Sequence, residues 1–121
     1  MTASEAFEDS ILTSVKKQLN IAEDYEAFDQ DIILLINSSF ATLHQLGVGP
    51  ENGFYIVDST TTWSEYLTDQ PLQLMNVKKF VYLETRLTFD PPQASVLTAF
   101  EKQLDELKWR IAVAVDELER G

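Results

Sequence analysis

Apolar residues recur at spacings of three and four along most of the chain, which is the pattern of amphipathic helices. The first stripe predicts a helix over about residues 4–19, with Asn20 as its stop. The second predicts a helix over about 25–46, because Gly47, Gly49 and Pro50 then block its continuation. The predicted buried face of the second helix comprises Phe28, Ile32, Ile36, Phe40 and Leu43.

Residues 47–61 are predicted to form a loop. Alternation around Phe54–Val57 is compatible with a short extended piece, but too few positions take part to predict a strand. Thr62 and Glu65 have the spacing of a capping box, which predicts a short helix beginning at this point.

A further helix is expected from Pro71, which suits a first turn, to about Thr88. Pro91 and Pro92 then close it, since proline disfavours helical geometry in the residue before it. Phe89 is apolar enough to pin the corner that follows. The predicted apolar stripe of this helix comprises Leu74, Val77, Val81 and Leu72, widened by Phe80, Leu83 and Leu87.

The last segment has the clearest periodicity, a heptad seam sustained for about three repeats. Its members are Leu97, Phe100, Leu104, Leu107, Ile111, Ala114 and Leu118. Two interpretations stay open: a helix that packs only on its own domain, or one that also docks against a neighbouring subunit. The fold class is therefore all-α: a compact four- to five-helix bundle with an irregular loop and a long C-terminal helix, forming a single domain over residues 1–121.

Charge narrows the possible partners. The chain has 121 residues with 20 acids and 9 bases, a formal net charge of −11. So acidic a body repels phosphate and anionic membranes, and it lacks the basic stripe of a duplex-binding protein. The acidity serves either solubility or a surface that stays near DNA without binding it.

Without cysteines, a secretory signal or a long apolar run, the chain is expected to be a soluble intracellular product.

The sequence contains no recognisable catalytic or metal-binding motif, so no catalytic residue, metal site or cofactor is expected. His44 is the only histidine, and its position near a helix end favours a capping or dipole role. Ala41 stands where a Glu-x-x-His metal motif would need glutamate. The aromatic residues fall among acids, so core packing is favoured over stacking on single-stranded nucleic acid. They are Trp63, Tyr66, Phe80, Tyr82, Phe89 and Trp109.

Several segments together resemble one family, the head-tail connector (adaptor) proteins of long-tailed phages and prophages. They are DIILLINSSFATLHQLGVGP over residues 31–50, WSEYL over 63–67, VKKFVYL over 77–83, FDPP over 89–92 and LDELKWR over 104–110. Their order and spacing match over about residues 8–119. One departure is Glu84, where a lysine is expected, and it puts a basic contact at that position in doubt.

The resemblance implies a structural virion protein without a catalytic site. Such subunits form a ring, commonly of twelve, between the portal protein and the tail completion or stopper proteins, and DNA passes through without specific binding. The implied location is the head-tail junction of the virion, and the host cytoplasm during assembly. The residues hypothesised to contact partners are Phe54, Tyr55, Ile56, Trp63, Leu104, Leu107, Ile111 and Leu118.

Two other classes remain open at this stage. One is an acidic partner-binding phage regulator or a tail assembly chaperone, which would be a stable monomer or dimer that binds one soluble protein. The other is an enzyme that acts through carboxylates and tyrosine alone, which a bound metal in the purified protein would favour.

Overall fold

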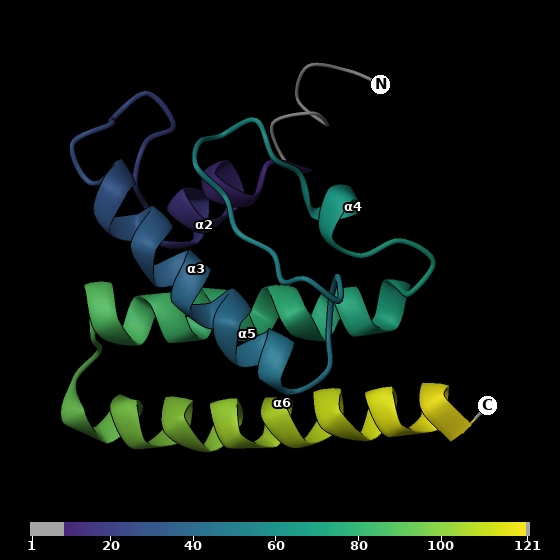
Figure 1. Cartoon of the computed structure of the whole chain (residues 1–121). Helices are drawn as coiled ribbons and strands as arrows, with labels where there is room; N and C mark the ends of the chain where they lie inside the picture. The colour runs from purple at the N-terminus through teal and green to yellow at the C-terminus, as the bar shows by residue number, and fades with distance from the viewer. Residues whose placement is uncertain (1–8, 121) are drawn as a thin grey trace.

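The computed structural model describes residues 9–120, and within them the chain forms helices and no strand (Figure 1). This confirms the predicted all-α class. The predicted start of the first helix, residues 4–8 with Phe7, lies outside the described residues. The helices are α2 (Ile11–Gln18), α3 (Asp29–Gln45), α4 (Trp63–Tyr66), α5 (Pro71–Phe89) and α6 (Ala94–Arg120).

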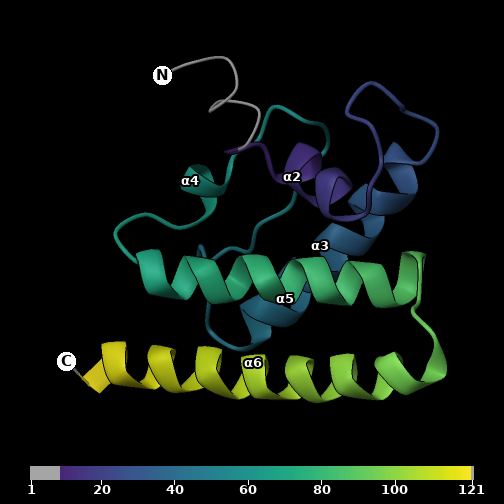
Figure 2. The same cartoon turned by 180° about the vertical axis from the view of Figure 1, so that it is seen from behind.

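Helix α5 lies at the centre of the arrangement. It packs against α6 on one side and against α3 and α2 on the other, and α5 and α6 run antiparallel along their whole length (Figures 1 and 2). The α5–α6 corner and the 20–28 loop lie at one end of this pair. The end of α3, helix α4 and the C-terminal end of α6 lie toward the other.

Most of the predicted apolar stripes meet in one hydrophobic core. Three predicted members are exposed instead: Phe28 (41%), Leu72 (76%) and Leu118 (60%). Phe28 precedes the first turn of α3, and Leu118 lies in the last turn of α6. Leu72 precedes the buried Gln73 and lies on the outer side of α5. The largest fully buried side chains are Trp63, Phe40, Phe80, Ile11, Ile32, Ile36, Leu43, Ile56, Ile111, Val15, Val77 and Val81.

Within the described residues, the helix predicted over about residues 4–19 is interrupted at Ser10, which has an extended backbone and caps α2. The Ser10 hydroxyl oxygen accepts a hydrogen bond from the Thr13 N–H (3.3 Å) and donates one to the Ser59 carbonyl (2.7 Å). The Ile11 N–H donates to the Thr61 carbonyl (3.1 Å). The same residues therefore start α2 and attach the distant 59–62 segment beside it.

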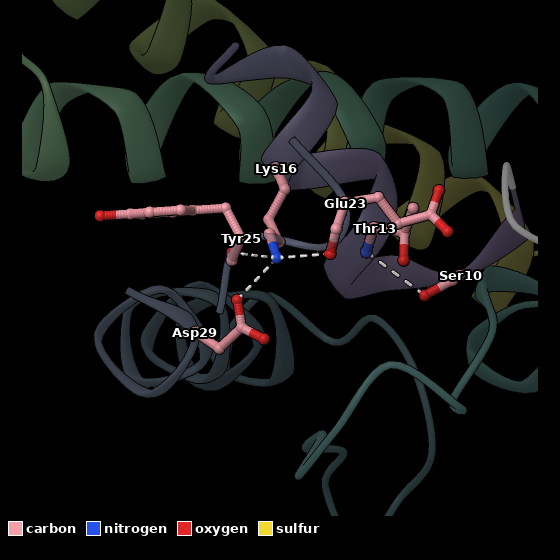
Figure 3. Close-up of polar contacts among 6 residues, drawn as sticks. All are labelled: Ser10, Thr13, Lys16, Glu23, Tyr25 and Asp29. Atoms are coloured by element: carbon pink, nitrogen blue, oxygen red, sulfur yellow. Dashed lines mark hydrogen bonds and ion pairs between the residues drawn. The ribbon is translucent and has the colours of Figure 1, made fainter. Parts of the chain in front are cut away.

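Helix α3 also begins later than predicted, at Asp29, because the preceding residues are held as a loop by a buried lysine (Figure 3). Lys16 is 2% exposed. Its ammonium group donates to the carbonyls of Glu23 (3.0 Å) and Tyr25 (2.7 Å) and pairs with the Asp29 carboxylate (2.8 Å). A buried ammonium needs such partners, since its desolvation is otherwise costly. Lys16 thus fixes the 20–28 loop between α2 and α3.

Helix α3 ends as the glycine pattern predicted. The Val48 N–H donates to the Leu43 carbonyl (3.0 Å) and the Gly47 N–H to the His44 carbonyl (3.0 Å), which is a Schellman motif. Gly47 has a φ of 90°, a conformation that glycine adopts without strain. Asn20, the predicted stop of the first helix, likewise has a positive φ of 61°.

No strand forms at residues 54–57, and the backbone of Ile56 is hydrogen-bonded to a side chain of α3 instead. The Asn37 amide donates to the Ile56 carbonyl (2.9 Å), and its oxygen accepts from the Ile56 N–H (2.8 Å). Ile56 consequently points into the core, whereas its neighbours Tyr55 and Val57 point to solvent. One asparagine on α3 therefore determines which side chains this loop exposes.

The start of α4 and the corner between α5 and α6 agree with the sequence-based predictions. The Glu65 carboxylate accepts from the Thr62 N–H (2.6 Å), as in the predicted capping box of α4. Phe89 is half-buried, and its ring lies 5.4 Å from the Phe28 ring, edge to face. The corner between α5 and α6 is therefore pinned to the start of α3 by an aromatic pair.

Replacing Lys16 with methionine should destabilise the fold by roughly 3–5 kcal/mol, because one substitution leaves the Asp29 carboxylate and two carbonyls without their donor. Urea denaturation measures the change. Lys79→Met removes the same charge from an exposed position on α5 and should change stability by no more than about 0.5 kcal/mol. Equal effects of the two variants would contradict a role for the buried network.

Replacing Asn37 with alanine should cost roughly 1–3 kcal/mol, because both backbone groups of Ile56 lose their partner in a partly buried place. Chymotrypsin should then cut after Phe54 or Tyr55 faster than in the unmodified chain. Ser38→Ala, at the exposed neighbouring position, is the matched control. A cleavage rate unchanged by Asn37→Ala would show that the loop is held by its apolar contacts alone.

Candidate functional site

The described residues offer no constellation for catalysis. Within residues 9–120, no group of three or more His, Cys, Asp or Glu side chains lies close enough together to hold a metal ion. His44 is exposed, and its Nε2 donates to the Glu51 carbonyl (2.9 Å), so it holds the turn that follows α3. None of the helices in this part of the chain combines the length and apolar content needed to cross a membrane.

The structure divides the eight residues hypothesised to contact partners into core and surface. Five are buried in the core: Ile56, Trp63, Leu104, Leu107 and Ile111. Their side chains are covered by the chain's own core, and their assignment as contact residues stays an untested prediction. The seam of α6 is covered by α5, because the heptad face is the one that the chain's own core uses.

The other three differ in exposure. Phe54 is half-buried and packs on the rings of Phe40 (5.1 Å) and Tyr66 (4.9 Å). Tyr55 is 71% exposed, and Leu118 near the end of α6 is also exposed. Tyr55 and Leu118 are therefore the two members of the set that a partner can reach directly.

Trp63 illustrates why a buried aromatic is structural. Its indole N–H donates to the Ser14 hydroxyl (2.9 Å), which in turn donates to the Ile11 carbonyl (2.9 Å). The ammonium group of Lys78 lies over its ring, 5.8 Å from the centroid. Trp63 thus joins α4 to α2 and is surrounded on all sides.

Trp109 contradicts the expectation that the aromatic residues are core. Its side chain is 67% exposed on α6. The heptad seam takes positions 104, 107 and 111, so position 109 falls on the opposite side of the helix, away from α5. Lys108 and Arg110 flank it, and Arg110 pairs with Glu106 one turn earlier. Tryptophan and arginine are both enriched among the residues that contribute most to binding at protein interfaces.

A hollow of about 420 Å³ lies at the end of the α5–α6 pair that carries the C-terminal part of α6. Its lining comes from the turn after α3, from α4 and the start of α5, and from the last turns of α6. The lining residues are Gly47, Val48, Gly49, Pro50, Tyr66, Leu67, Thr68, Gln70, Gln73, Val115, Leu118 and Glu119. We call it the end cavity.

Two features of the end cavity depend on single residues. Gly49 has a φ of 91°, and a Cβ added there would lie 2.6 Å from the Tyr66 ring, so only glycine fits. The Tyr66 hydroxyl and the Gln73 Oε1 atom are both buried without a hydrogen-bond partner. Burial raises the pKa of Tyr66 well above its ordinary value, which keeps its hydroxyl protonated. The sequence gives no signal for either atom, since both lie in the interior of expected helices.

Glu84 has a structural explanation. Its carboxylate accepts a hydrogen bond from the Ser39 hydroxyl (2.7 Å), and Ser39 is fully buried between α3 and α5. Two basic residues on the same helix are also engaged within the chain, as Lys78 lies over the Trp63 ring (5.8 Å) and Arg86 over the Phe100 ring (5.5 Å). An acidic side chain at position 84 therefore ties two helices together.

The comparisons with known proteins agree with the family resemblance. A family model described as phage connector protein matches residues 11–118. Neither the search of curated proteins nor the search of solved structures returned a match. The matched range runs from the first residue of α2 to the last turns of α6, and so includes the core and the end cavity. The chain belongs to the phage connector protein family, a family of structural proteins of the virion.

Proposed function

We propose that this protein is a head-tail connector subunit that assembles into a ring of twelve copies between the portal and the tail completion or stopper protein. Its contribution is assembly and not catalysis. The observation that supports this best is α6, a helix of 27 residues that covers about 40 Å. Its seam packs on α5, and its outer side, with Trp109, remains exposed.

A ring subunit needs two different contact patches, because cyclic assemblies with more than two members use heterologous interfaces. The chain exposes separate apolar groups that suit this requirement. Tyr55 and Val57 lie on the loop held by Asn37, while Trp109 and Leu118 lie on α6. We infer that residues 9–120, which share one core, behave as a single unit in the assembly.

The charge of the chain suits the passage of DNA. A net charge of −11 repels the phosphate backbone over about 8–10 Å in physiological salt. A ring whose inner wall carries this acidity would let DNA slide through without holding it. The subunit therefore works at the head-tail junction, after assembly in the host cytoplasm.

Electron microscopy of the purified protein with its portal tests the proposal. The expected result is a ring of this subunit on the portal. A stable monomer or dimer that ignores the portal and binds one soluble protein would contradict it, and would favour the acidic regulator or assembly chaperone instead.

Changing Tyr55 and Val57 together to serine should leave the unfolding midpoint nearly unchanged, because both side chains are exposed. The double variant should nevertheless form fewer rings on the portal and fewer tailed particles. Asn52→Ser, an exposed polar position on the same loop, serves as the control. Normal ring formation by the double variant would show that this loop is not a contact patch.

A further inference from the structure

The end cavity contains an acceptor that the chain itself does not satisfy. Gln73 is 6% exposed, and its amide nitrogen donates to the Ile111 carbonyl (3.0 Å), but its Oε1 atom has no partner. The Tyr66 hydroxyl beside the same cavity is also unpartnered, with the residue 4% exposed. Unsatisfied buried polar atoms cost about 1–3 kcal/mol each. A donor that enters the cavity would recover part of that cost.

The walls of the end cavity indicate which chemical groups an occupant needs besides the donor. The lining is mixed: Val48, Pro50, Leu67, Val115 and Leu118 supply its apolar part, and Thr68, Gln70 and Glu119 its polar part. An occupant that carries a donor on an apolar group matches this lining. Indole has this composition, since tryptophan has a single N–H donor and no acceptor. A volume of about 420 Å³ is large enough for such a side chain.

The rim selects for positive charge. Glu119 lines the cavity itself, and Asp69 and Glu117 line the hollow that adjoins it through Gln70 and Gln73. Neither lining contains a lysine or an arginine. An occupant that carries positive charge beside its apolar group is therefore favoured over a neutral or acidic one.

The chain itself exposes a segment with all three properties, namely Lys108-Trp109-Arg110. We propose that the end cavity of one subunit receives Trp109 of a second copy, with the indole N–H donating to Gln73 Oε1 and the flanking bases facing the acidic rim. This inference rests on the proposed function, because it names the contact between neighbours in the ring.

The contact must join two copies. Trp109 and the cavity residue Val115 belong to the same rigid helix, about 9 Å apart along its axis, and Trp109 points away from α5. Its own cavity is therefore out of its reach. Because two different patches meet, the contact is head-to-tail and can propagate around a ring.

Cysteine cross-linking tests the pairing directly, since the chain contains no cysteine. Full-length Lys108→Cys and Glu119→Cys variants are mixed and oxidised, with and without the portal. The expected product is a covalent dimer with one copy of each variant, and Trp109→Ala introduced into the Lys108→Cys chain should reduce its yield severalfold. The competing pair, Lys108→Cys with Asp24→Cys, tests the acidic 20–28 loop as the acceptor.

The outcomes separate this inference from the proposed function. Rings on the portal without the 108–119 product, or with the 108–24 product in its place, would overturn the Trp109 contact and leave the connector role intact. Absence of rings together with absence of the product would count against both.

A second measurement isolates the hydrogen bond. Trp109→Phe keeps most of the apolar bulk but removes the N–H, so association measured by sedimentation should weaken roughly threefold to tenfold. Gln73→Leu should weaken it similarly, and the two changes together should add little beyond either one. Unfolding midpoints show whether Gln73→Leu is still folded. Unchanged association of Trp109→Phe would overturn the pairing with Gln73.

Discussion

The structure depends on the burial of helix α5. Helices α2, α3 and α6 each pack against it and cover part of its surface. Val77, Phe80 and Val81 are fully buried, and the helix that carries them packs against α3, α2 and α6. In a chain of this size a core of this kind supplies most of the stability, because the buried apolar area is limited. Helix α6 uses its seam to complete the core, and this leaves its outer side free for other contacts.

Polar side chains do a different job, which is to fix the segments that are not helical. Lys16 holds the 20–28 loop, Asn37 holds the 54–57 loop, and Ser14 ties Trp63 to α2. Each of these three side chains has a partner in another element. These bonds give the irregular segments surfaces of defined shape.

Three buried hydroxyl or amide oxygens among the described residues lack a hydrogen-bond partner, and one of them, the Thr85 hydroxyl, lies in the core. Within the described residues, the unpartnered Tyr66 hydroxyl and Gln73 Oε1 both border the end cavity. The exposed Trp109 is the reverse case, an apolar group with an unused donor. In the proposed assembly, the indole N–H of Trp109 in one subunit supplies the donor that Gln73 Oε1 lacks in its neighbour.

The sequence by itself determined the helices, their stops and the family. Periodicity located α3, α5 and α6, and Gly47, Pro71 and the Pro91–Pro92 pair set their ends, because these signals act through the local backbone. Only the tertiary structure decided which apolar residues are available to a partner. A heptad seam looks the same whether it faces its own domain or another subunit, so Leu104, Leu107 and Ile111 became core while Trp109 became surface. The sequence also could not predict that α3 begins only at Asp29. That start depends on Lys16, a residue of another helix that the fold buries beside Asp29.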